Sequence, residues 1–223
     1  MDVKLTGGGF KPSQLIVVGG RPGMGKSALK FQVALRAANI GIPALYATLE
    51  MSAAEQAERG LRTIESGTFK QLPLLYTELT ELSKLITTIR YAHRRFSIRL
   101  ACIDYLQIVD SPMNRNENRE RRLANASRQM KNLASELKIP ILLGSQLNRE
   151  SERRGRPSLA DLRESGSIEQ DADIVILISG EPENSERELI IAKQRNGAKA
   201  IINASFDNKT LMFIDPELWT GKL

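Results

Sequence analysis

Cysteine, histidine and aromatic residues are scarce in this sequence, and long apolar runs are missing. A single cysteine, Cys102, excludes an internal disulfide, and a single histidine, His93, leaves no His/Cys cluster of the kind that binds zinc. The apolar runs have the length of strands, far short of the roughly 20 residues that span a bilayer. The glycine-rich start has no signal-peptide core. These absences argue against a secreted disulfide scaffold and a membrane protein, and they favour a cytoplasmic location.

The composition is that of an ordinary soluble globular protein. The chain has 223 residues, of which 41% are hydrophobic and 26% charged. This length suits one large domain, and no linker divides the chain, so we expect a single domain over residues 1–223. The net charge of +6 is mild, and much of the excess lies in residues 115–128 and 149–156. Taken alone, each basic cluster fits a solvated face better than a nucleic-acid contact.

Short branched apolar runs alternate with longer helical patterns along the chain. The early runs lack a two-residue alternation, as expected when helices cover both faces of a sheet. The predicted fold is therefore α/β, with a mostly parallel central sheet, right-handed crossovers, flanking helices and antiparallel C-terminal strands. The expected strands are 15–19, 44–49, 100–104, 140–145, 174–178, 188–193, 200–206 and 210–214. The expected helices are 26–40, 52–66, 78–95 and 120–137, and Ser52 with Glu55 fits a capping box.

The strongest motif follows the first predicted strand. Residues 20–27 match the phosphate-binding pattern G-x-x-x-x-G-K-[ST] in full, between an apolar strand and a helical pattern. Glycines let backbone N–H groups surround phosphate oxygens, and the following helix directs its positive end at the same anion. Lys26 is expected to bridge the β- and γ-phosphates, and Ser27 to ligate Mg²⁺. The predicted nucleotide-binding residues are Gly20, Arg21, Pro22, Gly23, Met24, Gly25, Lys26, Ser27 and Ala28.

Three further polar residues end apolar strands that should gather on the side of this loop. Asp104 is expected to hold Mg²⁺ through water, although without the loop motif it would be taken for a turn cap. Glu50 suits a general base for the attacking water, the alternative being a residue that merely flanks the helix beginning near Ser52. Gln146 is equally consistent with a γ-phosphate contact and with a turn residue.

Lys193 and Arg195 end a later predicted strand. Their two-residue spacing puts both cations on one side of that strand. Such cations suit a phosphate, including one bound by an adjacent subunit in the manner of an arginine finger. The residues alone favour a simpler interpretation, in which the cations protect an exposed edge strand from aggregation.

Together these segments resemble the RecA-like motor domain of DnaB-type replicative helicases. The resemblance covers most of the chain in the order of the family, and residues 161–173 and 193–197 are far more specific than a phosphate-binding loop. It implies an ATP hydrolase that uses Mg²⁺, moves 5′ to 3′ on single-stranded DNA and assembles as a homo-oligomer, with a hexameric ring expected. The matching segments are 20–27, 49–52, 103–107, 145–149, 161–173 and 193–197.

The resemblance also implies roles for individual residues. Glu50 corresponds to the catalytic glutamate, Asp104 to the acid that holds the metal through water, and Gln146 to the γ-phosphate sensor. Lys193 and Arg195 correspond to the pair that reaches the nucleotide of a neighbouring subunit. Three further residues fall in the loop that family members present to single-stranded DNA, where side chains and backbone N–H groups bind phosphates of any sequence. They are Arg163, Glu164 and Gly166.

The chain departs from the family pattern at its start. We expect it to lack the helical N-terminal domain and linker helix of the family, as an excised motor domain or a minimal family member would. Contact with a primase or a helicase loader is expected only if the full-length protein has the N-terminal domain. Two alternatives stay open: a recombinase-like filament ATPase, which residues 161–173 argue against, and a nucleotide-dependent DNA-binding module without hydrolysis, which Glu50 and Asp104 argue against.

Overall fold

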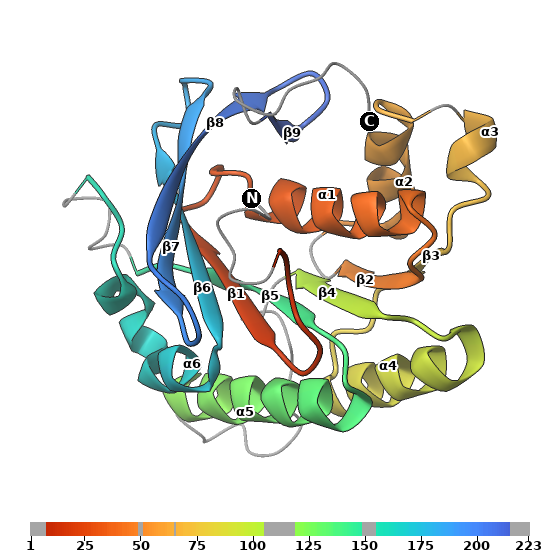
Figure 1. Cartoon of the computed structure of the whole chain (residues 1–223), viewed down its shortest axis with the longest axis horizontal. Helices are drawn as coiled ribbons and strands as arrows, with labels where there is room; N and C mark the ends of the chain where they lie inside the picture. Colours follow the sequence, from red (N-terminus) through yellow and green to blue (C-terminus); the bar gives the residue numbers. More distant parts are fainter. Residues whose placement is uncertain (1–7, 49–50, 65, 105–118, 149–154, 215–223) are drawn as a thin grey trace.

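The computed structural model describes residues 8–48, 51–64, 66–104, 119–148 and 155–214, and within these ranges a single sheet joins all the strands (Figure 1). The order across the sheet is β3-β2-β4-β5-β1-β6-β7-β8-β9. Neighbours that are distant in sequence, such as β1 beside β5, show that helical crossovers connect the strands. The strands are β1 Leu15–Gly20, β2 Ala44–Thr48, β3 Leu74–Thr77, β4 Leu100–Asp104, β5 Ile141–Gln146, β6 Ile174–Gly180, β7 Glu186–Gln194, β8 Ala200–Asp207 and β9 Met212–Ile214.

Strands β3, β2, β4, β5, β1 and β6 are parallel, whereas β7, β8 and β9 continue the sheet in antiparallel pairing. This confirms the predicted α/β fold with antiparallel C-terminal strands. Because parallel strands end at the same edge, Gly20 lies level with Gln146 across β1 and β5, and Thr48 lies level with Asp104 across β2 and β4. The register therefore gathers the carboxyl ends of β1, β2, β4 and β5 at one edge.

Helices cover both faces of the sheet. Alternate residues of β1 enter different cores: Leu15 and Val17 pack on one face, and Ile16 and Val18 on the other. All four are fully buried, which explains why the sequence shows no alternation of apolar and polar residues here. In Figure 1, α4 and α5 cover one face and α1 covers the other. The helices are α1 Lys26–Asn39, α2 Ala53–Leu61, α3 Ser66–Phe69, α4 Leu82–Phe96, α5 Arg119–Leu137, η4 Leu159–Ser165 and α6 Gly166–Asp171, η4 being a 3-10 helix.

The capping box predicted at the start of α2 is present. The Ser52 backbone N–H donates to Glu55 at 2.7 Å, and the Glu55 backbone N–H donates to the Ser52 hydroxyl at 3.2 Å. The helix ends earlier than predicted, however, and the short α3 follows it. Strand β3 and the pair η4 and α6 were also not predicted, because a strand of four residues and two short helical segments are too brief for a periodic pattern.

A buried amide joins the C-terminal strands to the helix that follows the phosphate-binding motif. The Gln32 side chain on α1 donates to the Phe213 carbonyl at 2.8 Å and accepts from the Phe213 backbone N–H at 2.9 Å. Both residues are buried, so each backbone group of Phe213 has the partner that burial requires. Strand β9 is thereby fixed against α1. None of the helices described here is long and apolar enough to cross a bilayer.

Candidate nucleotide-binding site

The phosphate-binding motif forms the turn between β1 and α1. Gly25 is the residue before α1 and has a left-handed backbone, with φ of 90°. An ideal Cβ at this position would lie 2.9 Å from the Phe213 ring and 3.2 Å from the Phe206 ring. Position 25 therefore requires glycine on two grounds, backbone conformation and space. The N-terminus of α1 consequently opens directly onto the loop, where its free N–H groups favour an anion.

The two cations of the loop are held by backbone oxygens. The Lys26 ammonium donates to the Arg21 carbonyl at 2.9 Å, so its charge lies over the loop. The Arg21 guanidinium donates to the Gly180 carbonyl at 2.7 Å, at the end of β6. Lys26 is therefore positioned where a phosphate tail cradled by the loop would receive its charge.

Ser27 and Asp104, the two residues predicted to hold a metal, lie together. The Ser27 side chain lies near enough to the Asp104 carboxylate to lower the pKa of that carboxyl. Asp104 is only 2% exposed, and its carboxylate also accepts from the Tyr46 hydroxyl at 3.2 Å and from the Lys30 ammonium. Burial by itself raises the pKa of Asp104, but the charge and hydrogen bond of Lys30, together with the nearby Ser27 and Tyr46 hydroxyls, outweigh it. The pKa is lowered overall, and Asp104 is ionised at neutral pH.

This pair of oxygen donors fits Mg²⁺. Mg²⁺ binds through one or two protein oxygens, water and substrate phosphates rather than through a complete protein cage. A hydroxyl and an ionised carboxylate close together beside a phosphate-binding loop supply that set. Ser27 and Asp104 are therefore the residues of this chain that would hold the ion.

A cavity of about 370 Å³ opens in front of the loop. Gln146 lies on its wall, as the γ-phosphate interpretation requires, together with loop residues 22, 23 and 25–28. The remaining wall was not predicted from the sequence, because its residues belong to α2, to the end of β8 and to the β8–β9 turn, and only tertiary packing brings them to the loop. They are Arg59, Phe206, Asn208 and Leu211.

Lys193 and Arg195 lie near the amino ends of the parallel strands, on the side of the sheet opposite to the phosphate-binding loop. The Arg195 guanidinium donates to Asp173 at 3.1 Å and to the Gln170 carbonyl at 2.8 Å, and the same Asp173 accepts from the backbone N–H of Leu15, the first residue of β1. The Lys193 ammonium donates to the Glu169 carbonyl at 2.5 Å. Burial, and then the Arg195 charge, lower the pKa of Lys193. Both cations thus point to α6 and away from the cavity at the phosphate-binding loop of their own chain, which lies at the other end of β1.

Some of the predicted residues lie outside the part of the chain that the structure describes. Glu50 is one of them, and its role stays a prediction. Arg163 and Glu164 belong to η4 and Gly166 begins α6, but the description does not extend to their side chains. Cys102, by contrast, is described and fully buried, and burial raises the pKa of its thiol to about 12, so the only cysteine is unreactive.

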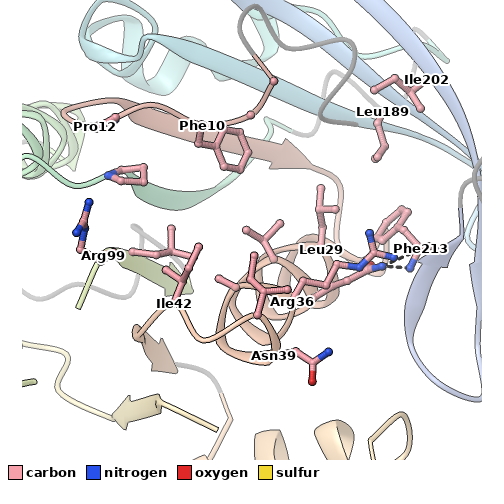
Figure 2. A pocket seen from close by; sticks show the side chains of 18 of the residues that line it. Phe10, Pro12, Leu29, Arg36, Asn39, Ile42, Arg99, Leu189, Ile202 and Phe213 are labelled. Atoms are coloured by element: carbon pink, nitrogen blue, oxygen red, sulfur yellow. Dashed lines mark hydrogen bonds between the residues drawn. The ribbon is translucent and has the colours of Figure 1, made fainter. Parts of the chain in front are cut away.

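A larger groove of about 770 Å³ lies elsewhere, between α1 and strands β7 and β8 (Figure 2). Apolar side chains such as Leu29, Leu189 and Ile202 line it, with Arg36 and Arg99 among its polar residues. Among the described residues that line it, none was predicted to bind nucleotide or DNA. Size alone would have pointed to this groove, whereas the phosphate chemistry points to the smaller cavity.

The phosphate-binding loop, the buried acid beside it and the order of the strands agree with a comparison of the sequence with family models. The model described as "DnaB-like helicase C terminal domain" matches residues 1–85 and 63–215. The chain belongs to this family. A probable replicative DNA helicase of Trieres chinensis is 35% identical over 248 residues, covering 93% of this chain and 54% of that protein. Replicative DNA helicase DnaB of Geobacillus stearothermophilus is 34% identical, with 94% and 54% covered. The DnaB-like chain thus spans about half the length of these relatives.

Two solved structures share the fold. A structure of a separate ATPase domain has a TM-score of 0.85 and 26% sequence identity, with 93% of this chain and 86% of that chain covered. A DnaB-like replicative helicase, whose structure describes its interactions with primase, has the same TM-score and identity, with 92% and 58% covered. The RecA-like architecture of this DnaB-like domain is thereby shown.

Proposed function

We propose that this chain is a single ATP-hydrolysing motor domain of a replicative DNA helicase, which uses ATP and Mg²⁺ to move on single-stranded DNA and unwind duplex DNA. The observation that carries the proposal is the buried, ionised Asp104 carboxylate with Ser27 close to it, beside a complete phosphate-binding loop. Because the chain belongs to the DnaB-like helicase family, we interpret this nucleotide site as that of a helicase motor. The same membership argues against a strand-exchange filament.

Each group of the site has a distinct task in this proposal. Backbone N–H groups of the loop and the Lys26 ammonium bind the β- and γ-phosphates, while Gln146 contacts the γ-phosphate from the end of β5. Mg²⁺ held by Ser27 and Asp104 supplies charge neutralisation of the phosphates. Glu50, two positions after β2, accepts the proton of the attacking water. Phe206 and Asn208 on the cavity wall contact the nucleoside.

Lys193 and Arg195 complete the site of a neighbouring subunit in this proposal. Their distance from the cavity of their own chain supports action in trans. The length of β1, roughly 16 Å of strand rise, separates the two cations from that cavity. Arg163, Glu164 and Gly166 bind single-stranded DNA, and they precede the carbonyls that Lys193 and Arg195 hold. The proposal also includes a hexameric ring, movement from 5′ to 3′ and a cytoplasmic location. It further includes contact of the longer protein with primase or a loader.

The function is tested by ATP turnover with and without single-stranded DNA, over a range of protein concentrations. Wild-type protein should hydrolyse ATP faster with DNA and with a cooperative dependence on concentration, because each site needs two subunits. Lys26→Ala should lose at least about 100-fold, since it removes a charge aimed at the transferred phosphoryl group. If wild type turned over no more ATP than Lys26→Ala in either condition, a binding module without hydrolysis would be favoured instead.

Mixing two inactive variants tests the action in trans. Arg195→Ala retains Glu50, and Glu50→Gln retains Arg195, so a mixed interface can carry both intact groups. For random equal mixing we expect up to about one quarter of wild-type turnover to return. Arg90→Ala, which removes the surface pair of Arg90 with Glu136, is the control and should keep its turnover without mixing. Absence of recovery despite demonstrated mixed assembly would exclude the trans role.

A further inference from the structure

A buried lysine shares the carboxylate that the proposed function assigns to the metal. Lys30 lies on α1, one turn after the phosphate-binding motif, and its side chain has no solvent exposure. Its ammonium donates to Oδ1 of Asp104 and to the Ile103 carbonyl at 3.3 Å. The other carboxylate oxygen, Oδ2, accepts from the Tyr46 hydroxyl. The positively charged Lys30 ammonium therefore already contacts the Asp104 carboxylate.

Burying the Lys30 ammonium costs free energy that an apolar side chain at this position would avoid. Neighbouring residues of α1, among them Leu29, Phe31 and Ala34, are buried and apolar, so an apolar side chain at position 30 would satisfy the packing. Burying an ammonium in such surroundings is unfavourable unless a carboxylate compensates it, and lysine is almost never fully buried without such a partner. Lys30 and Asp104 together are neutral, whereas Asp104 alone would present a negative charge to any cation at the phosphate-binding loop.

We propose that Lys30 is a built-in counter-ion of Asp104 that weakens Mg²⁺ binding at this site and makes retention of the ion depend on the nucleotide phosphates. The inference rests on the proposed function, because it takes Asp104 as the acid that holds the metal. Lys30 competes with a divalent cation for one carboxylate. Without nucleotide the ammonium satisfies Asp104; with nucleotide the phosphate oxygens supply the additional negative charge that retains the ion. Lys30 is thus a positioning residue. Its charge lowers the affinity of the site for the metal ion, and it does not touch the reacting atoms.

The test measures metal binding rather than turnover, with Mn²⁺ in place of Mg²⁺ because both prefer oxygen ligands. Free Mn²⁺ is followed by electron paramagnetic resonance at saturating ADP and without nucleotide. Lys30→Gln removes the charge while its amide can still donate to Asp104. Even with the screening of bulk water, unit charges 4 Å apart change an equilibrium about fivefold, so we expect Mn²⁺ to bind Lys30→Gln at least about fivefold more tightly than wild type. Lys30→Arg, which keeps the charge, should bind like wild type.

Two more variants give the result its meaning. Lys131→Gln removes the ammonium of another internal pair, in which Lys131 donates to Asp173 at 2.6 Å on the other side of the sheet, and should leave Mn²⁺ affinity unchanged. Asp104→Asn should weaken Mn²⁺ binding strongly. If wild type bound no Mn²⁺ with ADP, or if Asp104→Asn bound it as well as wild type, the proposed metal site itself would be wrong. If Asp104→Asn lost the ion while folded Lys30→Gln bound it no more tightly than wild type, only the counter-ion would be refuted.

Should Lys30→Gln fail to fold, as shown by circular dichroism, wild-type protein answers the question directly. The side-chain ¹³Cε and ¹⁵Nζ signals of Lys30, identified as those missing from Lys30→Arg, should shift when Mg²⁺ and ADP are added together. ADP without the metal should shift them much less. Signals that do not respond to the metal would show that the ammonium and the cation do not share Asp104, and the inference would fall.

Discussion

Gly25→Ala should lose nucleotide binding more completely than any other single methyl addition in the loop. Alanine in a left-handed conformation costs about 1–2 kcal/mol, and φ at this position is 90°. The added methyl would also lie 2.9 Å from the Phe213 ring, and such overpacking typically costs about 1–3 kcal/mol. The rings cannot easily retreat, because Phe206 and Phe213 pack edge to face at 5.0 Å and Gln32 holds the Phe213 backbone. The loop itself must therefore move.

We expect the affinity of Gly25→Ala for ATP to fall by about 100-fold or more, since every 1.4 kcal/mol is a factor of ten. Fluorescent-nucleotide titration and thermal melting measure the two effects. Two glycines serve as matched controls, because each has a positive φ and nothing within 4 Å of its ideal Cβ: Gly23 within the loop and Gly41 after α1. Gly23→Ala should lose about tenfold in affinity through strain alone, and Gly41→Ala should lose stability with unchanged affinity. Wild-type binding by Gly25→Ala would show that the loop tolerates the methyl.

Glu50→Gln should bind ATP normally and hydrolyse it about 10²–10⁴ times more slowly. The amide has the shape of the carboxylate but cannot accept a proton, and a positioned general base contributes a rate factor of this size. Position 50 follows β2, whose last residue, Thr48, is level with Asp104, and it precedes the capped start of α2. Single-turnover hydrolysis and nucleotide titration separate the two effects.

The control for Glu50→Gln is Glu58→Gln, the same change on the exposed surface of α2, where Glu58 pairs with Arg62. This variant should hydrolyse ATP at the wild-type rate, because a surface pair of this kind contributes little. Wild-type turnover by Glu50→Gln would refute the role of the base and would return Glu50 to the alternative of a residue that only flanks α2.

The strands that build the site could be predicted because each leaves a local signal. The runs ending at Gly20, Asp104 and Gln146 are apolar, and parallel pairing fixes where their ends lie. Strand β3 has four residues, all half-buried, so neither a long apolar run nor an alternation marks it. Strands β6 and β7 extend beyond their predicted ends. Ser179 on β6 and Arg187 on β7 are polar, but both are buried, and each pairs with a residue of the other strand.

The wall of the cavity and the partner of Asp104 could not be predicted in the same way. Phe206 and Asn208 lie 180 residues or more after Lys26 in the chain, and only the antiparallel extension of the sheet brings them to the loop. Lys30 left one signal, a lysine among apolar residues of the first helix, but the sequence does not say that the residue facing it is Asp104. Local patterns predicted the loop, and packing between distant elements determined what surrounds it.

The bonds of Lys193 and Arg195 have a mechanical consequence for an assembled motor. These cations hold the carbonyls of Glu169 and Gln170, at the end of the short helix that begins with Gly166. In the proposed action in trans, an Arg195 side chain that turned to the γ-phosphate of an adjoining copy would leave Gln170 and Asp173, because one guanidinium cannot occupy both positions. ATP binding in one subunit would then loosen, in the next, the segment proposed to bind single-stranded DNA, and these contacts would form again when the phosphate leaves.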